Sequence, residues 1–121
     1  MLAACREALE VAILALRVNR SRKRRGPQEL VHSLRLRGAQ CRPRSATERS
    51  VLRRIIRFVD SLFPSGPNCY RRALIEIATD AGAAKEPLRM GLAAEGGRNS
   101  GHAWLASSPD PDRRYDAEFS V

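Results

Sequence analysis

Two residues that can act together in covalent catalysis lie in the second half of the chain. Cys69 occurs in the segment GPNCYRRAL, and His102 occurs in the segment NSGHAWLA. A cysteine nucleophile needs a base within hydrogen-bond reach, and the base needs a group that orients it. Asp116 is the candidate for the orienting group because it is expected on the next strand across a turn. Asp112 is the less favoured candidate because it belongs to the turn itself.

The position of Cys69 in the sequence favours a reactive thiol. Asn68 is a good N-cap residue, so Cys69 is expected at the first or second position of a helix. Unpaired N–H groups and the helix dipole favour negative charge there, which stabilises a thiolate. Ala73 and Ile77 follow at intervals of four, so the sulfur is expected to point towards a sheet. The alternative is that Cys69 is a small buried apolar residue.

No chemical role is expected for the other cysteines or for the second histidine. Cys5 lies in an apolar segment, Cys41 lies in an arginine-rich loop, and the three cysteines form no CxxC pair. This pattern argues against a disulfide framework and against a four-ligand zinc site, and no metal or cofactor is expected. His32 is expected on the surface of a basic helix. Arg71 and Arg72 are expected to be solvated charges.

Apolar residues recur at helical spacing over the first two thirds of the chain. Pro27 suits the first turn of a helix, and Gly38 is expected where that helix stops. Ser45 and Glu48 have the spacing of a capping box. The period then changes to alternation, which predicts strands. The expected helices cover residues 2–18, 27–38, 45–63 and 69–81, and the expected strands lie within 87–95, 101–106 and 113–121.

These elements predict an α+β fold, in which N-terminal helices are followed by a small antiparallel sheet packed on the cysteine-bearing helix. The 121 residues are expected to form a single domain, with a basic helical region over 1–45 and a core over 46–121. The uncharged run in 2–18 is shorter than the roughly 20 residues that cross a bilayer. A cytoplasmic protein is therefore expected. For the helix expected over residues 2–18, three possibilities are open: it packs on the core, on a partner or on a membrane surface.

The composition points to a positively charged surface. The formal net charge is +9, and Lys23 and Lys85 are the only lysines, so arginine carries nearly all of the positive charge. Such a surface attracts polyanions or acidic peptides. A basic nucleic-acid-binding module is therefore one alternative function, although no recognisable nucleic-acid-binding motif is present.

The cysteine and histidine segments together resemble the core of the transglutaminase-like superfamily. More narrowly, they resemble the leader peptidase (B protein) of lasso-peptide biosynthesis, in which a Cys-x-x-Arg-Ala/Ser-Leu helix precedes a His-Ala-Trp strand. The resemblance is specific over 46–121 and only compositional before that. The matching residues are Cys69, Arg72, Ala73, Leu74, His102, Ala103 and Trp104.

The resemblance implies a transglutaminase/papain-like core and a cysteine protease that removes the leader from a ribosomally made precursor peptide. Cys69 would be the nucleophile, His102 the general base and then acid, and Asp116 the orienting group. Short members of this family depend on a separate leader-recognition protein and pass the core peptide to an ATP-dependent cyclase. No specific nucleic acid is implied as a partner.

Two further alternatives remain open. The same triad can carry out acyl transfer, as transglutaminases do, because the first half-reaction uses identical residues. The second alternative is a helical scaffold in which Cys69 and His102 do not come together.

Overall fold

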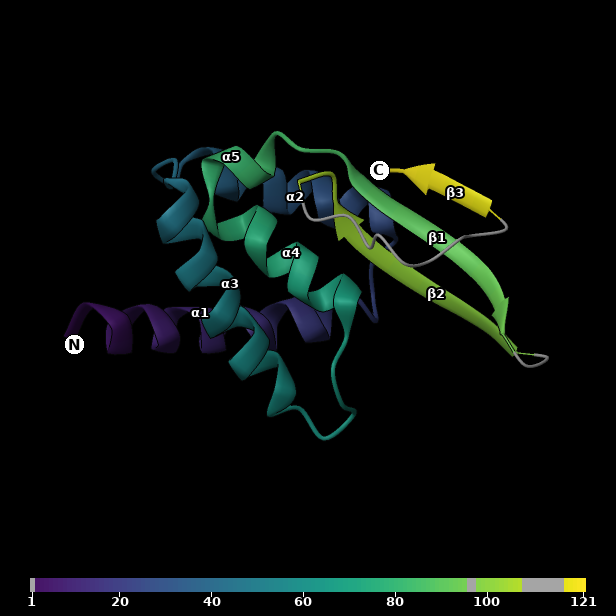
Figure 1. Ribbon diagram of the computed structural model, residues 1–121, viewed down its shortest axis with the longest axis horizontal. Coiled ribbons are helices and arrows are strands. Elements are labelled where there is room, and N and C mark those ends of the chain that lie inside the picture. Colours follow the sequence, from purple (N-terminus) through teal and green to yellow (C-terminus); the bar gives the residue numbers. More distant parts are fainter. Residues whose placement is uncertain (1, 96–97, 108–116) are drawn as a thin grey trace.

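A computed structural model describes residues 2–95, 98–107 and 117–121. Within these residues the helices all precede the strands, which confirms the expected α+β order. Figure 1 shows the helices grouped on one side, with strands β1 and β2 extending away from them. The helices are α1 (Leu2–Ser21), α2 (Pro27–Ala39), α3 (Ala46–Ser61), α4 (Cys69–Thr79) and α5 (Ala81–Ala84), and the strands are β1 (Leu88–Glu95), β2 (Arg98–Leu105) and β3 (Ala117–Ser120).

Local signals set the starts of helices α2 and α3 as expected. Pro27 occupies the first position of α2, with Gly26 as its N-cap. The Ser45 hydroxyl accepts a hydrogen bond from the Glu48 N–H at 3.1 Å, and the Glu48 carboxylate accepts one from the Ser45 N–H at 3.1 Å. The hydrogen bonds from the Ser45 backbone and hydroxyl hold the pKa of Glu48 below its ordinary value. The predicted capping box is therefore confirmed.

Helix α2 ends at Ala39, one residue after the predicted end at Gly38, and Gly38 is buried. A Cβ atom at Gly38 would lie 1.8 Å from the backbone oxygen of Ile77 in α4. The residue is glycine at this position because the backbones of α2 and α4 approach too closely for any side chain.

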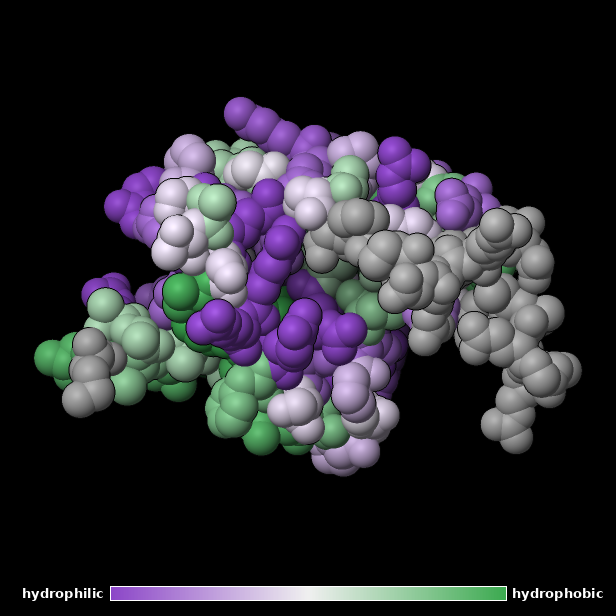
Figure 2. Space-filling model, viewed as in Figure 1, coloured by the Kyte–Doolittle hydropathy of each residue, from purple (hydrophilic) through white to green (hydrophobic). Residues whose placement is uncertain are grey.

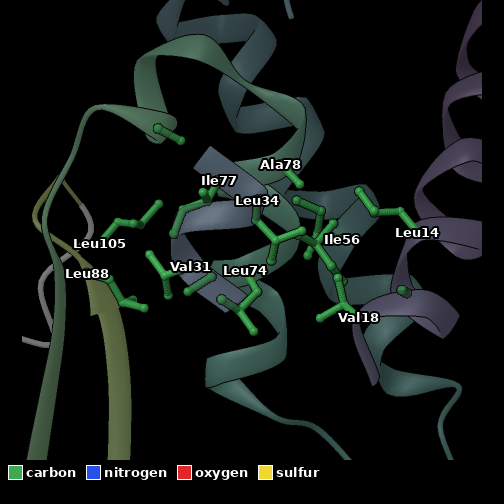
Figure 3. Packing of buried hydrophobic residues seen from close by; sticks show 14 of the residues in the cluster. Leu14, Val18, Val31, Leu34, Ile56, Leu74, Ile77, Ala78, Leu88 and Leu105 are labelled. Atoms are coloured by element: carbon green, nitrogen blue, oxygen red, sulfur yellow. The ribbon is translucent and has the colours of Figure 1, made fainter. Parts of the chain in front are cut away.

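Helix α4 lies at the centre of the molecule and packs against α1, α2, α3, α5 and β2. Its apolar residues meet one buried face of each surrounding helix, and Figure 3 shows this cluster from close by. The buried face of α1 is part of this core, and no helix among the described residues is long and apolar enough to cross a membrane. The labelled core residues are Leu14, Val18, Val31, Leu34, Ile56, Leu74, Ile77, Ala78, Leu88 and Leu105.

The described sheet has the strand order β2-β1-β3, and β1 is antiparallel to both neighbours. Successive strands were expected to be joined by turns, with the third strand next to the second. Instead β3 pairs with β1, so β2 is an edge strand. Arg35 of α2 fixes this arrangement, because its guanidinium donates hydrogen bonds to the backbone oxygens of Ala84, Glu86 and Val121 at 2.7–2.8 Å.

Candidate functional site

Cys69 occupies the first position of α4, as the sequence predicts. The Asn68 side chain accepts a hydrogen bond from the Arg71 N–H at 2.9 Å, and the Asn68 carbonyl accepts one from the Arg72 N–H at 3.0 Å. The N–H groups of Cys69 and Tyr70 have no acceptor within the described part of the chain. These two groups are therefore free to stabilise negative charge at the helix start.

The sulfur of Cys69 lies against the outer edge of β2. The backbone N–H of Ala103 points at the Cys69 Sγ, with 3.3 Å between nitrogen and sulfur. This contact confirms that the sulfur points towards the sheet. Cys69 is partly buried and lines a cavity.

His102 directly precedes the residue that contacts the sulfur, and it lines the same cavity as Cys69. Ala103 and Leu105 are buried and face α4. Side chains alternate along a strand, so His102 and Trp104 project from the other face of β2. His102 lies on an edge strand of the described sheet, one residue before Ala103, whose N–H contacts the Cys69 sulfur. Both residues line one cavity, with the Cys69 sulfur at the outer edge of β2 and the His102 side chain on the face of β2 that does not pack on α4.

The third member of the predicted triad, Asp116, lies outside the described residues, as does the less favoured Asp112. Because β3 pairs with β1, it does not lie next to β2, the strand that carries His102. Glu118 of β3 pairs with Gly91 of β1, which in turn pairs with His102, so the three form one row across the sheet. Two strand spacings, about 10 Å, separate the ends of this row.

Asp60 holds the segment before Cys69 in place, a role that no sequence pattern around Asp60 predicts. Its side chain is fully buried near the end of α3. One carboxylate oxygen accepts the Asn68 N–H at 2.9 Å and an Arg72 N–H at 3.0 Å, and the other accepts the Arg71 Nε–H at 2.6 Å. A single carboxylate therefore ties α3 to the N-cap and the first turn of α4.

The expected solvation of Arg71 is wrong. Its side chain is fully buried, and its guanidinium lies 3.8 Å from the centre of the Phe63 ring. It also donates hydrogen bonds to the side chain of Asn19 at 3.0 Å and to the carbonyl of Gly66 at 2.9 Å. Arg71 is buried because its donors find acceptors on α1, on α3 and in the loop that leads to Cys69.

A second network ties α3 to α4 and to the ends of the sheet strands. Arg49 binds the carboxylates of Glu76 and Glu86, and Arg53 binds Glu76 at 3.0 Å. Glu86 also accepts the Ser107 N–H, just beyond β2, at 2.7 Å. Partial burial acts to raise the pKa of Glu86, but hydrogen bonds from Ser107 and Arg49 outweigh it, so the pKa lies below its ordinary value. Figure 2 shows hydrophilic side chains gathered over this part of the surface.

The remaining candidates lie away from the Cys69 cavity. Cys5 and His32 are exposed, and the Cys41 thiol lies 3.6 Å from the Ala78 carbonyl oxygen, outside the cavity. Within the described ranges, no three side chains of His, Cys, Asp or Glu cluster in a way that would hold a metal ion.

Comparison with known proteins adds no assignment: no family model, curated protein or solved structure matches the chain.

Proposed function

We propose that the protein is a cysteine peptidase that removes the leader from a lasso-peptide precursor, with Cys69 as nucleophile and His102 as base. The observation that carries this proposal is the placement of Cys69 at the first position of α4, with its sulfur against β2 and His102 on the same cavity. The transglutaminase/papain-like core and the leader as substrate come from the resemblance of the CYRRAL and GHAWL segments.

Three features of the site support nucleophilic chemistry. The positive end of the α4 dipole favours the negative charge that develops beside the sulfur during the reaction. The N–H groups of Cys69 and Tyr70 are placed to bind an oxyanion that forms beside the sulfur. The Asp60 carboxylate holds Asn68, and therefore the start of the helix, against α3. A nucleophile held on a rigid element keeps its orientation towards a bound carbonyl.

The reaction runs in two steps. His102 takes the proton of the Cys69 thiol, the sulfur attacks the carbonyl carbon of the bond between leader and core, and the carbonyl oxygen becomes an oxyanion. The C–N bond then breaks, His102 gives this proton to the leaving amine, and a thioester remains on Cys69. Water next attacks the thioester carbon and gives a proton to His102; the C–S bond then breaks, the Cys69 sulfur takes that proton from His102, and the leader leaves with a carboxyl group. Asp116 is proposed to orient the imidazole.

The test is cleavage of a lasso precursor peptide in the presence of its leader-recognition protein, followed by mass spectrometry. Cys69→Ala is expected to abolish cleavage, and His102→Ala is expected to lower kcat at least 100-fold. Cys5→Ala is the matched control because Cys5 is an exposed cysteine far from the cavity. Cleavage by the Cys69→Ala protein at the wild-type rate would overturn the proposal.

A further amine assay separates hydrolysis from acyl transfer. A labelled primary amine added to the reaction competes with water for the thioester. Release of a free leader carboxylate, with little labelled amide, is expected for a peptidase. A product that is mostly labelled amide would show that the acyl-transfer alternative is correct.

A further inference from the structure

The cavity beside Cys69 has the size of a ligand site. Its volume is about 640 Å³, and it lies between the N-terminus of α4 and the sheet. Sites that bind small molecules or short peptide segments usually fall between about 300 and 1,000 Å³. Cys69 is on its wall, so whatever occupies the cavity lies beside the sulfur.

Apart from His102, the residues that line the sheet side of this cavity are apolar. Met90 of β1 pairs with Phe119 of β3, so these side chains lie next to each other on one face. Leu92 follows two residues after Met90 on the same face, and it would touch a Cβ placed on Gly101 at 3.6 Å. Leu92 is 48% exposed and Phe119 is 49% exposed. Both therefore have large apolar areas that an occupant of the cavity would cover.

The opposite side offers no counterion to a basic occupant. This side is lined by Pro67, which precedes the N-cap residue Asn68, and by Tyr70, which follows Cys69. Arg72 also lines the cavity, but Asp60 already binds its guanidinium at 3.0 Å. Among the described lining residues there is no carboxylate, so a lysine or arginine side chain would find no counterion there.

We propose that this cavity binds a bulky apolar side chain, of the size of leucine or phenylalanine, that lies within a few residues of the bond attacked by Cys69. The proposal rests on the proposed function, because it assigns specificity to the same site. Leu92 and Phe119 are its specificity-determining residues. They cover the apolar side chain, and they disfavour a charged side chain at the same place because it would lose hydration against two residues that offer it no polar group.

The experiment measures alkylation of Cys69 by blocked dipeptide chloromethyl ketones with alanine at the reactive end and leucine, glutamate or lysine before it. The sulfur forms a bond to the methylene carbon, chloride leaves, and the thiol proton goes to solvent. Intact-protein mass spectrometry gives each rate, and the rate with iodoacetamide corrects for the reactivity of the thiol itself. The leucine probe is expected to react about tenfold faster than either charged probe.

Substitution of Leu92 and Phe119 shows whether the preference for the leucine probe comes from these two residues. In the double variant Leu92→Ser, Phe119→Ser, the rates of the three probes are expected to agree within about twofold, with the iodoacetamide rate unchanged. Leu36→Ser is the matched control, because Leu36 is 59% exposed on α2 and does not line the cavity. Equal probe rates in the wild-type protein, or a leucine preference that survives in the double variant, would overturn the proposal.

The two proposals fail in different ways. The probe rates need only a reactive Cys69 and an apolar wall, and they require neither hydrolysis nor the recognition protein. If Cys69→Ala loses leader cleavage but the probe rates are equal, the peptidase proposal stands and the apolar subsite is refuted. A leucine preference with no cleavage of the precursor would leave the subsite and remove the leader peptidase.

Discussion

One oxygen of the Asp60 carboxylate lies 2.9 Å from the backbone nitrogen of Asn68, the residue directly before Cys69. The same oxygen binds Arg72, and the other oxygen binds the buried Arg71. Asp60 therefore acts on the position of Cys69 through Asn68, although it contacts no reacting atom. The start of the helix that carries Cys69 is therefore held by a charged side chain from the preceding helix.

Replacing Asp60 tests this arrangement by stability. Asp60→Asn keeps the shape of the side chain but leaves Arg71, which is fully buried, without its counterion. Loss of one partner from a buried pair costs about 3–5 kcal/mol, and a loss of this size in the free energy of unfolding is expected. Urea unfolding followed by circular dichroism measures it.

Arg72→Met is the matched control for that measurement. Arg72 is 34% exposed, and its removal leaves Asp60 paired with Arg71. The expected loss is about 1 kcal/mol or less, because a partly exposed ion pair contributes little. Similar losses in the Asp60 and Arg72 variants would contradict the central role of Asp60.

Gly38→Ala is expected to destabilise the protein by about 3 kcal/mol or more, because α2 must move away from α4 to make room for one methyl group. Thermal unfolding by calorimetry measures the change. Gly26→Ala serves as the comparison, since a Cβ there meets nothing within 4 Å. Its cost is expected to be below about 1 kcal/mol. If the Gly38→Ala protein were as stable as Gly26→Ala, the backbones of α2 and α4 could not lie as close together at Gly38 as described.

The lowered pKa of Glu86 predicts a loss of stability in acid. A carboxyl group whose pKa falls on folding stabilises the folded state above its unfolded pKa of about 4.3, and this contribution disappears as pH falls through the lower folded value. As the pH is lowered below about 5, the free energy of unfolding is therefore expected to fall more steeply for the wild-type protein than for Glu86→Gln. Urea unfolding at a series of pH values tests this. Parallel curves for the two proteins would show that Glu86 is not the group responsible.

The orienting group for His102 is tested with two carboxylate variants. Asp116→Asn is expected to lower kcat for leader cleavage at least 100-fold, because an amide does not stabilise the imidazolium as a carboxylate does. Glu118→Gln changes an exposed carboxylate on β3, and it is expected to keep more than half of the wild-type kcat. The opposite result would transfer the orienting role to Glu118, which shares a row of the sheet with His102.

The features that the sequence predicted correctly depend on residues close together in the chain. The Ser45–Glu48 capping box, the N-cap at Asn68 and the first helical position of Cys69 each involve hydrogen bonds or dihedral angles within about one turn of helix. Alternation of apolar residues likewise predicted that strands follow the helices. The α+β order needed no information from distant segments.

Tertiary packing decided the rest, because it depends on which distant segments meet. The burial of Arg71 required acceptors from Asn19 and Asp60, and the burial of Gly38 required the backbone of Ile77. The order β2-β1-β3 depends on which strand reaches the free edge of β1, and alternation carries no information about partners. The sequence by itself determined where Cys69 begins its helix, whereas the tertiary structure decided that its sulfur lies against the edge of β2 at Ala103, the residue after His102.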